Sequence, residues 1–201
     1  MIIRLFTITV VASIFLFFSG CMGTFETARV VPLKVGATYF TTVESNEDNS
    51  FSMPGIIVET GLPAGPARFG IGLHLRVAAV LEENDDNGFM LVWGGKIQIP
   101  ENSLVDIALG LDVWGYFPGE VKLYISRRIG SIEPYICIGI ADFIDYKNND
   151  IHVLSTDGLV SYTMGTMVEL GGDSGWMLAA EIEGGKVWAS PGVGLGLIKE
   201  F

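Results

Sequence analysis

The sequence predicts an all-β protein that folds as an antiparallel up-and-down transmembrane β-barrel of about ten strands, with eight as the alternative count. Three observations predict this class. Apolar residues alternate with small or polar residues in one segment after another, glycine makes up 26 of the 201 residues, and long and short connections alternate along the chain. Alternation with a period of two indicates β-strands, and alternating short turns and long loops are typical of transmembrane barrels.

Composition fits this class and excludes others. The chain is 49% hydrophobic and only 17% charged, and its 12 basic and 23 acidic residues give a net charge of −11. Soluble domains carry about 25% charged residues. A chain this acidic is a poor partner for nucleic-acid phosphates, and a chain this apolar is not disordered. Its length predicts one domain.

Residues 1–20 predict a signal peptide. One basic residue, Arg4, precedes an almost purely apolar run from Leu5 to Phe18, which is shorter than the ~20 residues of a membrane-spanning helix. Small residues then lead to Cys21. The sequence Ser19-Gly20-Cys21 resembles the lipobox of bacterial lipoproteins, although Phe18 stands where leucine is usual.

This resemblance implies that Cys21 is the lipidation site. The chain would be cut before Cys21, which would then carry acyl chains such as palmitate on its sulfur and its new amino group. More than one acyl chain gives stable anchoring, and no other cofactor is expected. An ordinary signal peptide followed by a chance cysteine is the alternative. Lipidation leaves Cys137 as the one remaining cysteine, so no disulfide is expected.

After an N-terminal anchor or linker at residues 21–32, we expect one barrel domain over residues 33–201. The clearest alternation runs from Ala67 to Leu81, where every second residue is apolar from Phe69 onward. The expected strands lie at 33–43, 54–61, 67–81, 88–99, 104–115, 120–129, 132–143, 159–170, 175–183 and 192–200. Most are close to the ~9–11 residues that cross a bilayer at a tilt.

The connections predict the topology. Short turns are expected at 62–66, 100–103, 130–131 and 171–174, and longer loops at 44–53, 82–87, 144–158 and 184–191, with 116–119 as a short exception. Acidic residues gather in the longer loops, for example at Asp85 and Asp86. Short periplasmic turns and longer outer loops give this alternation in a bacterial barrel.

Alternation alone does not tell which face points outward. The nearly continuous leucine, isoleucine and valine rows suit contact with lipid, and the glycines of the other face suit the inside of a narrow barrel. Bulky aromatic residues near strand ends suit the two membrane interfaces. The alternative is a soluble periplasmic lipoprotein barrel, with its apolar face inward around an apolar ligand.

With the polar face inward, a set of polar side chains is expected in the lumen. These are Arg68, His74, Arg76, Lys96, Gln98, Asp106, Asp112, Lys122, Tyr124, Arg128, Glu133, Glu169, Glu181 and Glu183. Buried charges need partners, so a salt-bridged, filled interior is favoured over a narrow conduit for small solutes. His74 is expected to bond Asp106, Asp112 or Tyr124.

The C-terminus carries a second resemblance. Val193, Leu195 and Leu197 alternate toward a final Phe201, which resembles the C-terminal signal of bacterial outer-membrane β-barrel proteins; Lys199 departs from it. The resemblance implies assembly by the barrel-assembly machinery and outer-membrane lipid of a Gram-negative-type bacterium as the surroundings. An even number of strands would place Cys21 and Phe201 on the same, periplasmic side.

Evidence for catalysis is weak. The pair Asp150 and His152 resembles half of the site of omptins, ten-stranded outer-membrane proteases, but Asp85 and Asp86 are adjacent where the other half needs a spaced pair. With two histidines and one free cysteine, a metal centre is not expected. We therefore expect a lipid-anchored outer-membrane barrel with a structural, interaction or small-solute channel role and no catalysis.

Overall fold

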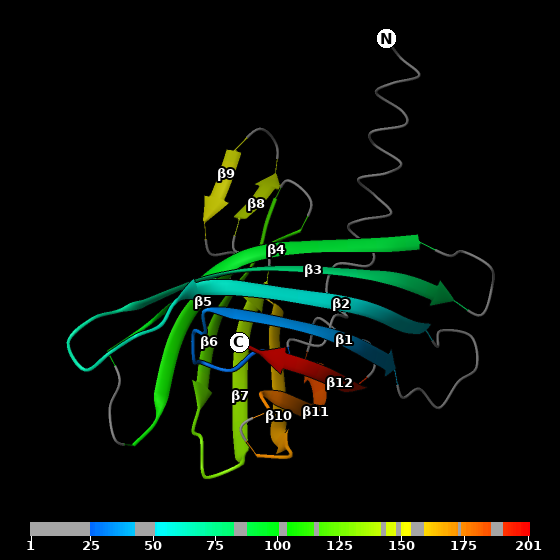
Figure 1. The fold of residues 1–201 in the computed structure, drawn as a ribbon. Coiled ribbons are helices and arrows are strands. Elements are labelled where there is room, and N and C mark those ends of the chain that lie inside the picture. The colour runs from blue at the N-terminus through cyan, green and yellow to red at the C-terminus, as the bar shows by residue number, and fades with distance from the viewer. Residues whose placement is uncertain are drawn as a thin grey trace.

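A computed structural model describes residues 25–42, 51–82, 88–100, 104–114, 117–141, 144–147, 150–153, 159–172, 174–185 and 191–201 (Figure 1). The strands are β1 (Leu33–Thr42), β2 (Phe51–Leu62), β3 (Gly70–Glu82), β4 (Gly88–Gln98), β5 (Asp106–Trp114), β6 (Phe117–Ser126), β7 (Ile132–Ala141), β8 (Ile144–Lys147), β9 (Asp150–Val153), β10 (Leu159–Leu170), β11 (Trp176–Gly185) and β12 (Gly192–Glu200).

Ten of these strands form one closed antiparallel barrel. Its order is β1-β12-β11-β10-β7-β6-β5-β4-β3-β2, so every barrel strand pairs with its neighbours along the chain and β12 closes against β1. In the closing pair, Tyr39 lies opposite Leu195 and Lys34 opposite Glu200. The predicted fold class is confirmed, with ten strands and not eight. Alternation with a period of two was sufficient to predict the fold class, because each barrel strand pairs with the next barrel strand along the chain.

The remaining two strands were not predicted. β8 and β9 pair with each other as a separate two-stranded sheet, with Asp145 opposite His152, inside what the sequence predicted as a plain loop at 144–158. This hairpin stands apart from the barrel wall (Figure 1). Each of its strands has four residues, too few to give a readable alternation. Within the described residues, no helix is long and apolar enough to span a membrane.

Strand ends differ from prediction mainly at β2, β3 and β6. β2 begins at Phe51 and β6 at Phe117, both earlier than expected. The β5–β6 pairing contains a register shift between Asp112 and Val113. β3 begins at Gly70, because residues 65–68 form a tight turn with a bridge between Gly65 and Arg68. The prediction that Arg68 faces the lumen is therefore wrong: its side chain lies in this turn and is exposed.

The wall has its apolar side outward. Along β3, Leu73 is 62% exposed, His74 is 4% exposed and Leu75 is 42% exposed, and the same alternation runs around the barrel. Glycines of the inward face make room for large side chains. A Cβ built on Gly110 would lie 2.7 Å from the ring of Tyr124, which is fully buried. The predicted orientation of the two faces is thus confirmed.

One part of the lumen is apolar, which the sequence did not predict. Six inward side chains on the loop-side halves of the first four strands form a buried cluster: Phe40, Met53, Ala78, Val80, Met90 and Val92. Here both faces of the wall are apolar. Charged side chains such as Lys34, Glu59 and Lys96 lie nearer the short-turn end of the barrel, whereas Glu120 and Glu183 lie on the loop-side halves of β6 and β11.

The N-terminal segment occupies that charged region. Residues 25–31, which we call the lumenal segment, lie inside the barrel, and six of their side chains are buried: Phe25, Glu26, Thr27, Ala28, Val30 and Val31. Pro32 then reaches the wall, where its carbonyl accepts hydrogen bonds from Gly61 and Thr60. Residues 25–31, which the sequence analysis gave as part of an anchor or linker at 21–32, thus pack inside the barrel, a placement that the sequence did not predict.

Candidate functional site in the barrel lumen

The wall holds the lumenal segment through its backbone. The N–H of Phe25 donates to Glu181 (2.9 Å), that of Ala28 to Ser126 (3.2 Å) and that of Val30 to Gln98 (2.8 Å). The carbonyl of Thr27 accepts from Lys96 Nζ at 2.8 Å. A segment without strand partners would otherwise leave these groups unpaired in a buried place, which is costly.

The side chain of Glu26 lies at the centre of the site. Its Oε1 lies 3.1 Å from Nδ1 of His74, and both side chains are fully buried. Burial alone would raise the pKa of Glu26, but the positive charges of His74, Arg76 and Lys96 outweigh it and lower the pKa to about 2. Glu26 is therefore a carboxylate that the wall binds by charge.

His74 connects Glu26 to a second group of charges. Its Nε2 lies 2.9 Å from Oδ1 of Asp112, and the other oxygen of Asp112 pairs with Arg76 and, at 2.8 Å, with Lys122 Nζ. Lys122 also pairs with Glu120 at 3.1 Å. Of the three partners expected for His74, the structure thus gives Asp112. The group spans β3, β5 and β6, so ion pairs tie three strands together across the lumen.

A third group joins β1, β2 and β4. One carboxylate oxygen of Glu59 pairs with Lys34 at 2.5 Å and the other with Lys96 at 2.8 Å, and all three side chains are buried. The Nζ of Lys96 also lies 5.6 Å from the ring centre of Tyr124. Because Lys96 also donates to the carbonyl of Thr27, this group helps to hold the lumenal segment inside the barrel.

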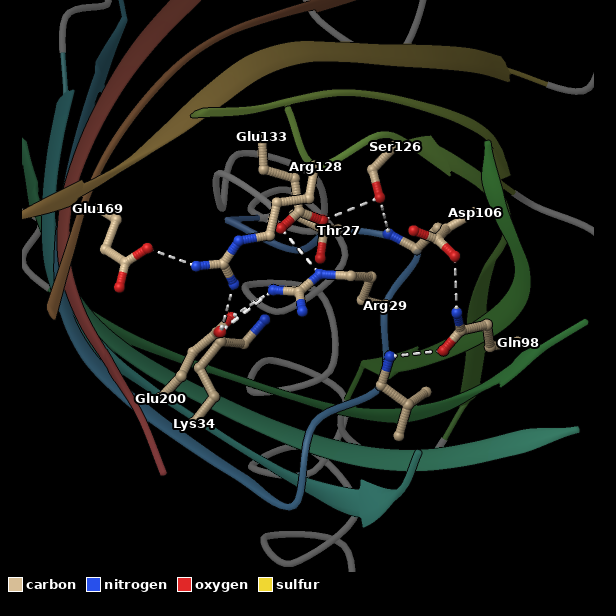
Figure 2. Close-up of polar contacts among 12 residues, drawn as sticks. Thr27, Arg29, Lys34, Gln98, Asp106, Ser126, Arg128, Glu133, Glu169 and Glu200 are labelled. Atoms are coloured by element: carbon tan, nitrogen blue, oxygen red, sulfur yellow. Dashed lines mark hydrogen bonds and ion pairs between the residues drawn. The ribbon is translucent and has the colours of Figure 1, made fainter. Parts of the chain in front are cut away.

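The short-turn mouth of the barrel is closed by Arg29 (Figure 2). Arg29 Nε lies 2.9 Å from Glu133 and its Nη2 lies 3.1 Å from Glu200, so one guanidinium joins β7 to β12 across the opening. Burial would lower the pKa of Arg29, but Glu133 and Glu200 together raise it. Further out, Arg128 pairs with Glu169 at 2.6 Å.

Most of the side chains expected in the lumen come together there. Ten are buried: His74, Arg76, Lys96, Gln98, Asp112, Lys122, Tyr124, Glu133, Glu181 and Glu183. Asp106 is half-buried and accepts from Gln98, while Arg128 lies at the mouth and is exposed, because it follows the last residue of β6. Arg68 is not among them.

Six charged residues of the lumen and its mouth were missed. Lys34, Glu59, Glu120 and Glu200 lie on barrel strands, and Lys34 could have been found, since it has the same parity as the inward Gly36. Glu26 and Arg29 lie in a segment with no alternation, so no periodic signal marks them. Their contacts are instead with residues far along the chain; Arg29 and its partner Glu133, for example, are more than a hundred residues apart in the sequence.

The comparisons with known proteins add no family. No family model and no curated protein matches the chain. One matching solved structure, titled "Asymmetric conductivity of engineered proteins", covers 85% of this chain and 100% of its own, with 10% identity and a TM-score of 0.33. A likeness this low carries no argument about function.

Some expected sites lie outside the described residues. These are the signal peptide at 1–20, Cys21, and the loop acids Asp85 and Asp86. The backbones of Asp150 and His152 lie on β9, but their side chains are not among those described, so the omptin resemblance stays a prediction. Among the described residues, no group of three or more histidine, cysteine or acidic side chains is placed to hold a metal ion.

Proposed function

We propose that this chain is a lipid-anchored β-barrel of the bacterial outer membrane, with a closed lumen and a structural or interaction role in place of catalysis. The observation that carries the proposal is the reversed polarity of the wall: leucines, isoleucines and valines point outward, and ion pairs fill the inside. In water this arrangement would expose a large apolar surface at great cost, whereas in a bilayer it is the stable one.

The dimensions of the wall support a membrane location. The barrel strands have 9 to 13 residues, enough to cross the hydrocarbon layer at a tilt. Closure of the barrel pairs every strand edge, which a spanning sheet requires. Exposed aromatic side chains near both ends suit the interfaces, with Phe69, Trp176 and Phe201 at the short-turn end and Phe89 at the other.

The lumenal segment supports a closed barrel over a small-solute channel. Its backbone and side chains are bonded to the wall from Phe25 to Val30, and Arg29 bridges the mouth. A solute would have to displace buried ion pairs. The same filling argues against a soluble barrel that holds an apolar ligand, because the apolar part of the lumen is already packed by its own side chains.

The proposed partners are outer-membrane lipid and the barrel-assembly machinery, which would recognise the last strand ending at Phe201. Lys199, the residue that departs from the expected signal, has its ammonium 5.5 Å from the ring of Trp176 and 5.4 Å from that of Phe201. This rim position lets a long basic side chain reach the polar interface. Nucleic acid is not a proposed partner.

Orientation follows from the same features. We propose that the short turns and Phe201 face the periplasm. The expectation that both termini are periplasmic rests on an even number of strands, which places the start of β1 and the end of β12 at the same end of the barrel. Phe25, four residues after Cys21, lies inside the lumen.

Refolding and conductance test the proposal. The mature chain, refolded in detergent and moved into liposomes, should migrate differently on a gel before and after boiling and should give no stable conductance in a planar bilayer. A chain that stays soluble and folded without detergent would favour the soluble barrel. Stable single-channel currents from the intact chain would favour the small-solute channel.

A further inference from the structure

The wall around Glu26 is built for a negative charge. The basic side chains of the two connected ion-pair groups are Lys34, Arg76, Lys96 and Lys122. The acidic ones on the wall are Glu59, Asp112 and Glu120. These two groups thus have four basic side chains against three acidic ones, and Glu26 adds a fourth acidic one.

The occupant of this place, Glu26, belongs to a segment outside the sheet. The lumenal segment belongs to none of the described strands, and four of its backbone groups bond to the wall through contacts that do not depend on its side chains. The carboxylate of Glu26 is the charged group that the segment places at the centre of the lumen. It brings the two ion-pair groups to equal numbers of acidic and basic side chains.

We infer that the inner wall of β3, β4 and β5 is a carboxylate-binding site, filled in cis by Glu26, which accepts a free carboxylate when that side chain is removed. His74 on β3 contacts the carboxylate directly, and behind it Asp112 on β5 keeps the imidazole oriented through its 2.9 Å contact. Lys96 on β4 binds the carbonyl of Thr27, the residue after Glu26, and places a positive charge nearby. Arg76 adds positive charge from the same strand as His74.

The burial of the site favours the binding of an anion by charge. The side chains of Glu26 and His74 are fully buried, so the site excludes bulk water and an anion there is weakly screened. The contact of the carboxylate with the wall is the one to Nδ1 of His74, whose ring is fixed on its other side by Asp112. The site differs in this from a patch of surface lysines.

Chemical rescue tests the inference in the full mature chain. Replacing Glu26 by alanine removes the atoms of one acetate ion and leaves the two ion-pair groups with one more basic than acidic side chain. Glu26→Ala should therefore unfold at a lower temperature than the parent in detergent micelles. Acetate, present during refolding, should raise its unfolding temperature along a saturating curve, and should leave the parent chain unchanged.

Two controls separate binding at this site from general salt effects. Acetamide has the shape of acetate without the charge and should not rescue Glu26→Ala, and sodium chloride at the same ionic strength should not rescue it either. In Glu26→Gln the amide fills the space, so acetate should have little effect. Equal shifts with acetate, acetamide and chloride would overturn the inference, and so would an equal acetate shift in the parent.

The test remains decisive if the alanine variant folds poorly. The measured quantity is then the folded fraction after refolding, read from gel migration before and after boiling. Folding that appears with acetate and not with acetamide supports the site, and failure to fold in either contradicts it. Because the readout is made in micelles, its outcome is independent of the membrane location and of conductance.

Discussion

Oε1 of Glu26 lies 3.1 Å from Nδ1 of His74 in the middle of the barrel, and neither side chain is exposed to solvent. The contact joins the lumenal segment to β3. It also joins Glu26 to Asp112, Arg76 and Lys122 through the other ring nitrogen of His74. The segment is thus part of the ion-pair system that crosses the lumen, and its removal affects the wall as well.

Loss of the charge at Glu26 should destabilise the barrel. Glu26→Gln keeps the size of the side chain but leaves buried positive charge without its counter-charge, and breaking a buried pair costs about 3–5 kcal/mol. Denaturant unfolding in micelles, followed by circular dichroism, measures the change. The matched control is Glu169→Gln at the mouth, whose pair with Arg128 is partly exposed and should contribute less than about 1 kcal/mol. Equal losses from both variants would contradict a buried role for Glu26.

The same carboxylate predicts an acid-dependent loss of stability. The folded pKa of Glu26, about 2, is lower than its ordinary value of 4.5, so its contribution is complete above pH 4.5 and is lost as the pH falls from 4.5 toward 2. The parent chain should lose more unfolding free energy over this range than Glu26→Gln, since other carboxyl groups titrate in both. Parallel curves for the two proteins between pH 5 and 2.5 would show that Glu26 is not held by charge.

Arg29 and Glu133 should be energetically coupled. Arg29→Gln leaves the fully buried carboxylate of Glu133 without its cation, so the single variant should be destabilised. Adding Glu133→Gln removes the stranded charge, and the double variant should recover part of the loss. A double-mutant cycle on unfolding free energies measures the coupling, which we expect to exceed about 1 kcal/mol. Additive effects would mean that the segment does not close the mouth.

The sequence predicted the residues of the barrel wall better than the segment that fills the lumen. Alternation at His74, Arg76, Lys96 and Asp112 was enough to place these residues in the lumen, because a closed barrel of hairpins leaves only two directions for a side chain. The pattern failed at Arg68, where the alternation continues into a turn. It also could not show the lumenal segment, since Glu26 and Arg29 are positioned by contacts with residues far along the chain and not by local periodicity.

Packing in the lumen should not tolerate added methyl groups where aromatic rings lie against glycine. In Gly110→Ala the new Cβ would meet the ring of Tyr124 at 2.7 Å and the carbonyl of Gly95 at 3.2 Å. Tyr124 is fully buried and has no room to move, so a loss of about 1–3 kcal/mol is expected. Gly88→Ala is the control, because nothing lies within 4 Å of its added Cβ. A neutral Gly110→Ala would mean a looser lumen than the structure has.

The orientation of the wall is tested most directly by spin labels on the outer face of β3 in liposomes. Cysteines are introduced one at a time at Ile71, Leu73 and Leu75, which are 54%, 62% and 42% exposed. They are labelled in a chain whose Cys21 and buried Cys137 are both replaced by serine. Each label should collide often with oxygen, which dissolves in lipid, and rarely with a water-soluble nickel complex. Frequent collisions with the nickel complex at all three positions would place this face in water and contradict a membrane barrel.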